Sequence, residues 1–395
     1  MKFVFHVSPN LQSKNSTQRI MRDLTIGLLI VFIAALIYYA VAWGMNYALQ
    51  ALLLLVCSLA TTFVCEAVFA KVKKQDIKEV ISHSFGWVTS IILVMMCPIS
   101  ITPFAVIVAT FFAIAIGRLV FGGFGYNIFN PAAVGRAVIF ASFAGAATSL
   151  VTSATPTGVL ATSFRWLPGT ERALQSFLDY TGGWGGLFLG TYPGAIGETF
   201  SLLIILVGIF LIVRNVIDWR IPVFYLGTIF VITLVVALLE GIEPYHGIPG
   251  FLWYPALHLL TGGVIFGAFF MLTDPVTIPT VPSGRIFFAI CAAAITVLIR
   301  LKGNMPEGCL FSILIMNTFT PMIESALDAP QLKQMKKAWI MIGCSAVFAL
   351  CVAFYAATTV LPVKAPRKIG AESEGEEAAL VLTETEASRR MEVLS

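Results

Sequence analysis

The residues best suited to covalent chemistry are the small hydroxyl residues of the run Thr152-Ser153-Ala154-Thr155-Pro156. Small side chains leave an oxygen open to a modifying enzyme. The run also interrupts a chain made otherwise of long apolar stretches, so a bilayer cannot cover it. We therefore expect Thr155 to be an attachment point for a prosthetic group. It is the one position where the residues indicate redox chemistry rather than transport alone.

A glycine-rich turn followed by two asparagines forms the second candidate site. Three glycines between positions 122 and 125 precede Asn127 and Asn130, and Pro131 follows. Glycines permit tight turns and a close approach of the backbone to a planar ligand. The asparagines offer amide donors and acceptors, which could bind the pyrimidine edge of a flavin within the membrane. Capping of the next helix by asparagine is the simpler alternative.

Carboxylates inside apolar runs are costly at membrane depth and are therefore candidates for function. Glu66 lies deep in the second apolar run, and Asp274 precedes a proline at the end of another. We take both as ion-pathway candidates, with helix capping as the alternative for Asp274. Structural roles are the simpler interpretation for Glu198, Glu240 and Glu324. The spacing of the histidines and cysteines predicts no metal site.

Composition identifies the class of protein. Hydrophobic residues make up 58% of the chain and charged residues 12%, with a mean hydropathy of +0.89. A soluble domain carries about twice that charged fraction. The apolar residues form runs close to the ~20 residues that cross a bilayer as a helix, without the alternation typical of a β-barrel. The expected fold is an all-α polytopic membrane protein.

Ten apolar runs are predicted to span the membrane. They are Leu24–Trp43, Tyr47–Ala70, Phe85–Cys97, Pro103–Phe121, Ala132–Ala147, Thr199–Val213, Ile221–Glu240, Pro255–Leu272, Ile286–Ile299 and Ala338–Leu361. A lysine cluster between positions 71 and 78 follows the second run and places the N-terminus in the cytoplasm. An even number of spans returns the C-terminus to the same side, with residues 148–198 on the outer face.

Two patterns recur in the two halves and predict a duplication. Pro98-Ile99-Ser100-Ile101 corresponds to Pro275-Val276-Thr277-Ile278, and Asn127–Pro131 corresponds to Asn317–Pro321. Proline and asparagine break helices, and exposed backbone at membrane depth must be buried in protein or line a cavity. Five spans per copy make the second copy inverted, with its site at the repeat interface. Chance recurrence is the alternative.

This interpretation divides the chain into five segments. They are a cytoplasmic N-terminus (1–23), a first five-helix repeat (24–147), an extracytoplasmic loop with the modification site (148–198), a second five-helix repeat (199–362) and a disordered cytoplasmic tail (363–395).

Several stretches resemble one family of membrane proteins. They are Gly122–Gly135, Gly194–Thr199, Gly262–Thr277 and, near the start, Ser8-Pro9 with Ser16–Met21. The family is the flavin-carrying membrane protein shared by two respiratory complexes. In the ion-translocating ferredoxin:NAD oxidoreductase (Rnf) it is the D subunit, and in the sodium-translocating NADH:quinone reductase (Nqr) it is the B subunit. The short N-terminus is more similar to the Rnf protein.

The resemblance implies two flavins. A flavin transferase would attach FMN to Thr155 through a phosphoester, and riboflavin would bind noncovalently near Asn127 and Asn130. The family's acceptor pattern is similar to D-x-x-[S/T]-G-A-[S/T], and this chain departs from it at Ser149 and Ser153. These departures put recognition by the transferase in doubt.

The resemblance also implies electron transfer between ferredoxin and NAD, coupled to movement of Na+ or H+ across the bacterial cytoplasmic (inner) membrane. The partners would be the other membrane and peripheral Rnf subunits, including iron–sulfur and flavin subunits, together with membrane lipid. Nucleic acid is not an expected partner. The alternatives are an Nqr-type B subunit, a small-solute channel or secondary transporter with inverted repeats, and a scaffold whose flavin site has decayed.

Overall fold

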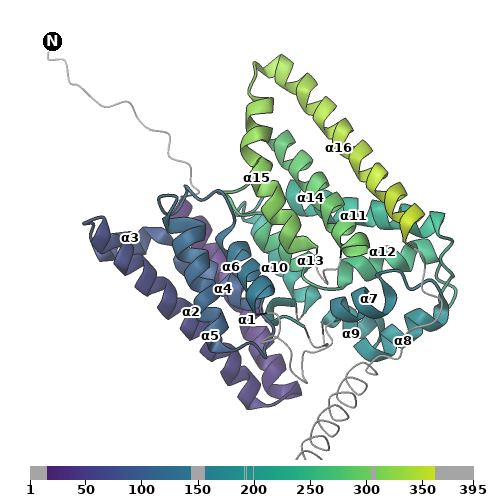
Figure 1. Cartoon of the computed structure of the whole chain (residues 1–395), viewed down its shortest axis with the longest axis horizontal. Coiled ribbons are helices and arrows are strands. Elements are labelled where there is room, and N and C mark those ends of the chain that lie inside the picture. The colour runs from purple at the N-terminus through teal and green to yellow at the C-terminus, as the bar shows by residue number, and fades with distance from the viewer. Residues whose placement is uncertain are drawn as a thin grey trace, which may run out of the picture.

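The computed structural model describes residues 16–143, 156–190, 192, 194–198, 200–303 and 308–360, and these residues form a layer of packed helices (Figure 1). Thr155, residues 148–154 and the tail 363–395 lie outside the described residues, so the predictions made for them stay predictions.

The first half supplies eight helical elements. They are α1 (Thr17–Ala42), α2 (Met45–Val72), α3 (Ile77–Ser84), α4 (Gly86–Met95), α5 (Pro103–Phe111), the π-helix η1 (Phe112–Leu119), α6 (Pro131–Ser142) and α7 (Pro156–Phe164). Local sequence explains several of the boundaries. The Ser16 side chain accepts from the Arg19 amide and caps α1, and prolines occupy the first turns of α5 and α6.

The remaining elements lead to the C-terminal end. They are α8 (Glu171–Thr181), α9 (Gly183–Leu189), η3 (Ile196–Glu198), α10 (Ser201–Val213), α11 (Arg220–Leu239), α12 (Gly250–Leu260), α13 (Val264–Phe266), the π-helix η4 (Gly267–Met271), α14 (Pro282–Lys302), α15 (Cys309–Leu327) and α16 (Gln331–Thr359). The predicted loop 148–198 therefore contains the helices α7, α8 and α9, which the sequence did not predict.

The all-α membrane architecture is confirmed. Six described helices are long and apolar enough to cross a bilayer, two bent pairs (α3 with α4, α12 with α13 and η4) meet the same test, and three shorter apolar segments accompany them. These are eleven apolar segments, against the ten predicted. The additional one is α15, and it corrects the expectation that Pro321 marks a break, because Pro321 lies inside this helix.

Ion pairs join the helix ends on the side of the layer at which α1 begins, called here the N-terminal side. Arg214, at the end of α10, contacts Asp23 of α1 at 2.7 Å, and Asp218 binds Arg220 and Arg285. Burial opposes ionisation of Asp218, but hydrogen bonds from the Arg220 amide and the Arg285 guanidinium outweigh it and lower its pKa. The same side carries the end of α15, because Leu327 packs near Gly284.

The other face of the layer, called the opposite side, carries the ends of α1 and α16. Tyr39 donates to the Gly194 carbonyl, and Lys302, at the end of α14, donates to the Thr359 carbonyl. Helices α7, α8 and α9 lie on this side (Figure 1). The helix that leads to the tail therefore ends opposite the start of α1. The side of the membrane on which each terminus lies stays a prediction.

The two halves follow the same order. In the first, α2 packs on α4 and α5, and in the second, α11 packs on α12 and α14. The third member of each half is a bent pair, at 49° and 69°. The Asp23–Arg214 pair joins the start of α1 to the end of α10, so these matching helices run in opposite directions. Helix α16 is additional and packs on α11 and α14.

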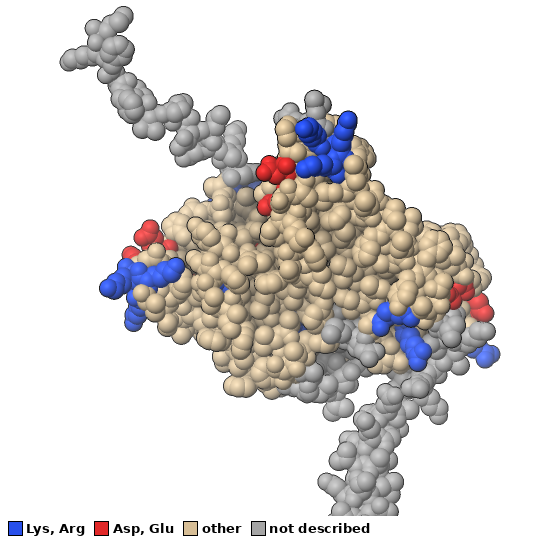
Figure 2. Space-filling model, turned by 45° about the horizontal axis from the view of Figure 1, so that its top comes forward, with Lys and Arg blue, Asp and Glu red and all other residues tan. Residues whose placement is uncertain are grey.

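The surface is mostly uncharged. Figure 2 shows the visible charged side chains in small groups near the edges of the molecule, with a broad uncharged area between them. Isoleucines and valines of α1 and α2 are exposed, including Ile33 and Val64. An exposed apolar surface of this kind is typical of a helix layer that faces lipid.

Candidate functional site

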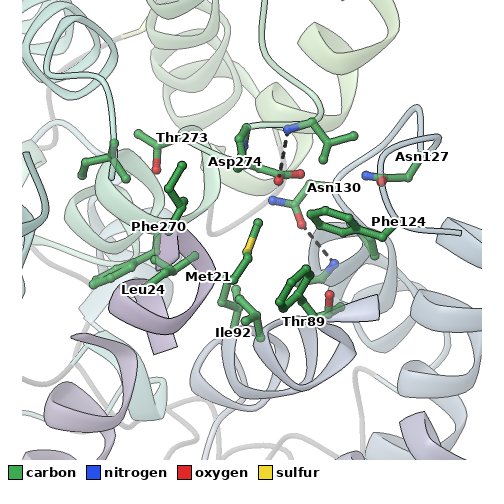
Figure 3. A pocket seen from close by; sticks show the side chains of 18 of the residues that line it. Met21, Leu24, Thr89, Ile92, Phe124, Asn127, Asn130, Phe270, Thr273 and Asp274 are labelled. Carbon is green, nitrogen blue, oxygen red and sulfur yellow. Dashed lines mark hydrogen bonds between the residues drawn. The ribbon is translucent and has the colours of Figure 1, made fainter. Parts of the chain in front are cut away.

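A narrow cavity on the N-terminal side brings together most of the predicted site residues. Its volume is about 50 Å³, and its lining includes Asn127, Asn130 and Asp274. In Figure 3 the Asn130 and Asp274 side chains lie next to each other, with Asn127 to one side. Aromatic and aliphatic side chains of α1, α4 and η4 close the rest of the wall, so these polar groups lie in an apolar surrounding.

A buried ion pair adjoins this cavity. The Nη1 atom of Arg118, which lines the cavity, lies 3.7 Å from Oε1 of Glu66, and the two side chains are 2% and 0% exposed. Among the described residues, neither oxygen of Glu66 has a hydrogen-bond partner, and the same holds for Nε and Nη2 of Arg118. Buried charges are normally paired and fully hydrogen-bonded. This pair therefore keeps capacity to bind a further polar group.

The position of Arg118 depends on an irregular stretch of helix. It lies in η1, a stretch of π-helix that continues α5, and its guanidinium packs over the Phe124 ring at 5.3 Å. A π-helical segment frequently marks a functional site. A glycine makes room for the partner carboxylate, since a Cβ atom at Gly86 would lie 2.2 Å from Oε1 of Glu66. The start of α4 therefore closes directly over Glu66.

Asp274 follows the second π-helix, η4. Its carboxylate accepts from the Val276 amide at 3.5 Å and from the Thr277 hydroxyl at 3.2 Å, as in a capping turn. Asp274 also interacts electrostatically with Arg118. The capping role is thus present, and the same carboxylate lines the cavity that Arg118 also lines.

The two asparagines have mainly structural partners. The Asn130 oxygen accepts from the amides of Ala132 and Ala133 and caps α6, while its nitrogen donates to the Met271 carbonyl. With the Asn317 side-chain amide oriented to satisfy both its oxygen and its nitrogen, the oxygen accepts from the backbone N–H of Asn130 at 2.9 Å. The two copies of the recurring motif, Asn127–Pro131 and Asn317–Pro321, are therefore in contact.

Asn127 shows the same pattern, since its amide nitrogen donates to the Phe129 carbonyl. The geometry of both asparagines favours the capping alternative. A cavity of about 50 Å³ also holds water or a small ion, whereas a three-ring flavin requires the wall to move. The residues as arranged do not fit riboflavin, and its binding at Asn127 and Asn130 stays a prediction. No cluster suited to a metal occurs among the described residues.

The other carboxylates lie elsewhere. The Glu198 carboxylate accepts from the Ala195 amide, and Glu324 accepts from the amide and hydroxyl of Thr280. Glu240 caps the end of α11. These contacts agree with the structural roles expected for them.

Arg118 is the residue that sequence reasoning missed. It lies between Ile116 and Leu119, inside a predicted span, and the rule that flagged Glu66 applies equally to a cation at membrane depth. The search for charged residues inside the predicted spans considered only carboxylates, and it therefore did not identify Arg118. Arg300, which directly follows the predicted span Ile286–Ile299, is also buried, near the end of α14.

The fold and the cavity define a class: a polytopic helical membrane protein with a charge cluster inside its helix layer. A family model described as "NQR2, RnfD, RnfE family" matches residues 4–333. The chain belongs to this family.

Two relatives are D subunits of ferredoxin:NAD oxidoreductases. The one from the proton-translocating ferredoxin:NAD(+) oxidoreductase complex of Clostridium ljungdahlii is 37% identical over 82% of this chain and 93% of its own length. The one from the Na(+)-translocating complex of Acetobacterium woodii is 36% identical over 80% and 91%. The B subunit of the Na(+)-translocating NADH-quinone reductase of Ectopseudomonas mendocina is 32% identical over 70% and 67%. The chain is thus an Rnf/Nqr-type component of an ion-translocating oxidoreductase complex.

Proposed function

We propose that this chain is the flavin-carrying membrane component of an Rnf-type complex that passes electrons between ferredoxin and NAD and moves Na+ or H+. The observation that carries this proposal is the similarity to the D subunits of two such complexes over more than nine-tenths of their length. Electrons enter and leave through partner subunits, and a flavin transferase matures the chain.

Covalent FMN at Thr155 is the redox part of the proposal. When bound, FMN supplies one- and two-electron transfer chemistry. The residue that follows Thr155 begins α7, which packs on the opposite side of the layer. We propose that the N-terminal side faces the cytoplasm, in accord with the lysines near position 73, so that Thr155 is extracytoplasmic.

The Glu66–Arg118–Asp274 cluster is the ion-coupling part. Arg118 pairs with Glu66 and lines the same cavity as Asp274, and neither oxygen of Glu66 has a hydrogen-bond partner among the described residues. A Na+ ion or a proton binds carboxylate oxygens, so its arrival at Glu66 competes with the guanidinium. The role of these residues is to hold one positive charge, either that of Arg118 or that of the ion, inside the layer.

The first test replaces the flavin acceptor. Wild type and Thr155→Ala are produced with a flavin transferase and run on a denaturing gel under ultraviolet light. We expect yellow-green fluorescence and an added FMN mass in the wild type, and neither in Thr155→Ala. A matched control, Thr162→Ala, alters a hydroxyl within α7 and should keep the label. An unlabelled wild type would contradict covalent flavinylation.

A further inference from the structure

A groove on the outer surface of the helix layer runs between α2 and the helix that α5 and η1 form together. Its volume is about 740 Å³, within the range of ligand sites. At one end, the hydroxyls of Ser58 and Thr110 share a hydrogen bond of 2.9 Å, which holds the two helices together. The groove begins about one turn further along α2, at Thr61, and continues toward the N-terminal side.

The wall of the groove is almost entirely apolar. Val64 and Val68 line it from α2, and Phe111 lines it from α5. All three are exposed, although each has a large hydrophobic side chain. Thr61 is polar, but its hydroxyl donates to the Cys57 carbonyl of its own helix. The groove therefore suits a hydrocarbon ligand.

Positive charge gathers where the groove ends on the N-terminal side. Lys73 lines this end, and its ammonium lies 4.8 Å from the centre of the Phe69 ring. The segment that follows also carries the acidic residues Asp76 and Glu79. Three further lysines surround them, and all are exposed: Lys71, Lys74 and Lys78. None of the four lysines forms an ion pair with a carboxylate of the described residues, so this end of the groove favours an anion.

The length of the groove matches one leaflet of a bilayer. From Thr61 to Lys73 the helix rises about 18 Å, whereas the hydrocarbon core of both leaflets together is about 30 Å thick. A lipid acyl chain extends through one leaflet, with its headgroup at the membrane surface. A spanning helix of a partner subunit would need a groove along the full thickness. The length therefore favours a lipid.

We propose that this groove binds an anionic phospholipid, with one acyl chain between α2 and η1 and the phosphate against Lys73. Clusters of lysines next to a membrane-spanning helix attract anionic headgroups. The apolar wall holds the chain, and the lysines select the charge of the headgroup. The inference involves neither a flavin nor electron transfer, so it is independent of the proposed function.

The bound chain also lies behind the buried ion pair. Cys65 and Leu119 line the groove and are the sequence neighbours of Glu66 and Arg118. An acyl chain in the groove therefore packs against the two helices that carry the pair.

The experiment uses phosphatidylglycerol, which is anionic, and phosphatidylcholine, which has no net charge. Each lipid carries a photoreactive group on one acyl chain. Each is added to the full chain in detergent and, separately, to the complex isolated from its membrane. After illumination, mass spectrometry identifies the labelled peptides.

Two variants test the two parts of the groove. Lys73→Glu reverses the charge at its end, and Val68→Trp places a large side chain in its middle. The matched controls are Lys336→Glu, at an exposed lysine of α16, and Val231→Trp, at an exposed valine of α11. All four positions are exposed, so we expect every variant to fold, and thermal unfolding in detergent checks this.

We expect phosphatidylglycerol to label residues 61–73 and 107–120 more strongly than phosphatidylcholine does. Lys73→Glu should lower phosphatidylglycerol labelling there roughly ten-fold and leave phosphatidylcholine labelling unchanged, because only the anionic headgroup interacts with the lysines. Val68→Trp should lower the labelling by both lipids. The two controls should behave as the wild type.

Equal labelling by the two lipids would overturn the proposal, and so would labelling that Lys73→Glu or Val68→Trp leaves unchanged. Labelling of the chain alone that is lost in the complex would also overturn it, since a partner subunit would then cover the groove.

Discussion

At the scale of single residues, the distinctive feature is a guanidinium and a carboxylate buried together with little hydrogen bonding. Taking two charges out of water costs several kcal/mol per ion, and their attraction offsets this only with good geometry. The pair of Arg118 and Glu66 at 3.7 Å is long for a strong contact. Such a pair is a weak source of stability, which is consistent with a role in binding an ion.

Removing one member of the pair should harm folding more than removing both. Arg118→Met leaves Glu66 as an uncompensated buried carboxylate, and we expect a loss of about 3–5 kcal/mol. The double variant Arg118→Met with Glu66→Gln should recover most of that loss. Thermal unfolding in detergent measures both.

If the double variant were as unstable as the single one, the charges would not be responsible. A folded double variant also separates the effect of the ion pair on stability from its effect on ion translocation. Assembled into the complex, it should conduct electrons but fail to move the ion across a sealed vesicle membrane.

At the scale of elements, close helix crossings depend on glycine. A Cβ atom at Gly135 of α6 would lie 2.9 Å from the Ala109 carbonyl oxygen and 3.0 Å from the Ala113 Cβ, and neither atom can move without moving α5 or η1. These are the helices that lead to Arg118. The position of the charge cluster therefore depends on this crossing.

Gly135→Ala should destabilise the protein by about 1–3 kcal/mol, because overpacking forces the backbone apart. Gly227→Ala is the matched control, since it lies in α11 with nothing near its ideal Cβ, and it should be neutral or stabilising by up to about 1 kcal/mol. Apparent Tm values in detergent test both. Equal effects at the two positions would argue against the close crossing.

Hydropathy predicted the class and most of the spanning elements but not α15. Asn317, Thr320, Pro321 and Glu324 lower the hydropathy of this helix to 1.4, the lowest of the six long spans. It is helical because one face, with Ile313 and Met316, is buried by its neighbours. Helices α7, α8 and α9 also escaped prediction, since short helices depend on tertiary packing.

Each candidate residue could be predicted from the sequence, but the contacts among these residues in the folded protein could not. Asn130 reaches the Met271 carbonyl across 141 positions of sequence, and Arg118 joins Glu66 to the surroundings of Asp274. Contacts between distant segments are fixed by packing of the two halves, which no local pattern encodes.

At the scale of the whole molecule, the start of α1 and the end of α16 lie on opposite sides of the helix layer (Figure 1). Alkaline phosphatase fused after Val360 should be active, and the same enzyme fused after Asp76 should be inactive, if the N-terminal side is cytoplasmic. Fusions of green fluorescent protein should give the reverse result, because this reporter folds in the cytoplasm. Activity of the same reporter at both positions would place the two fusion points on one side of the membrane and contradict this expectation.

Helix α14 runs from one side of the helix layer to the other. It begins near Asp218 on the N-terminal side, ends at Lys302 on the opposite side, and has 21 residues, so it is about 31 Å long. That length approximates the thickness of a bilayer's hydrocarbon core. An electron on the flavin proposed at Thr155 and an ion held near Glu66 would therefore sit at different electrical depths, and a voltage imposed across a proteoliposome would shift the balance between them.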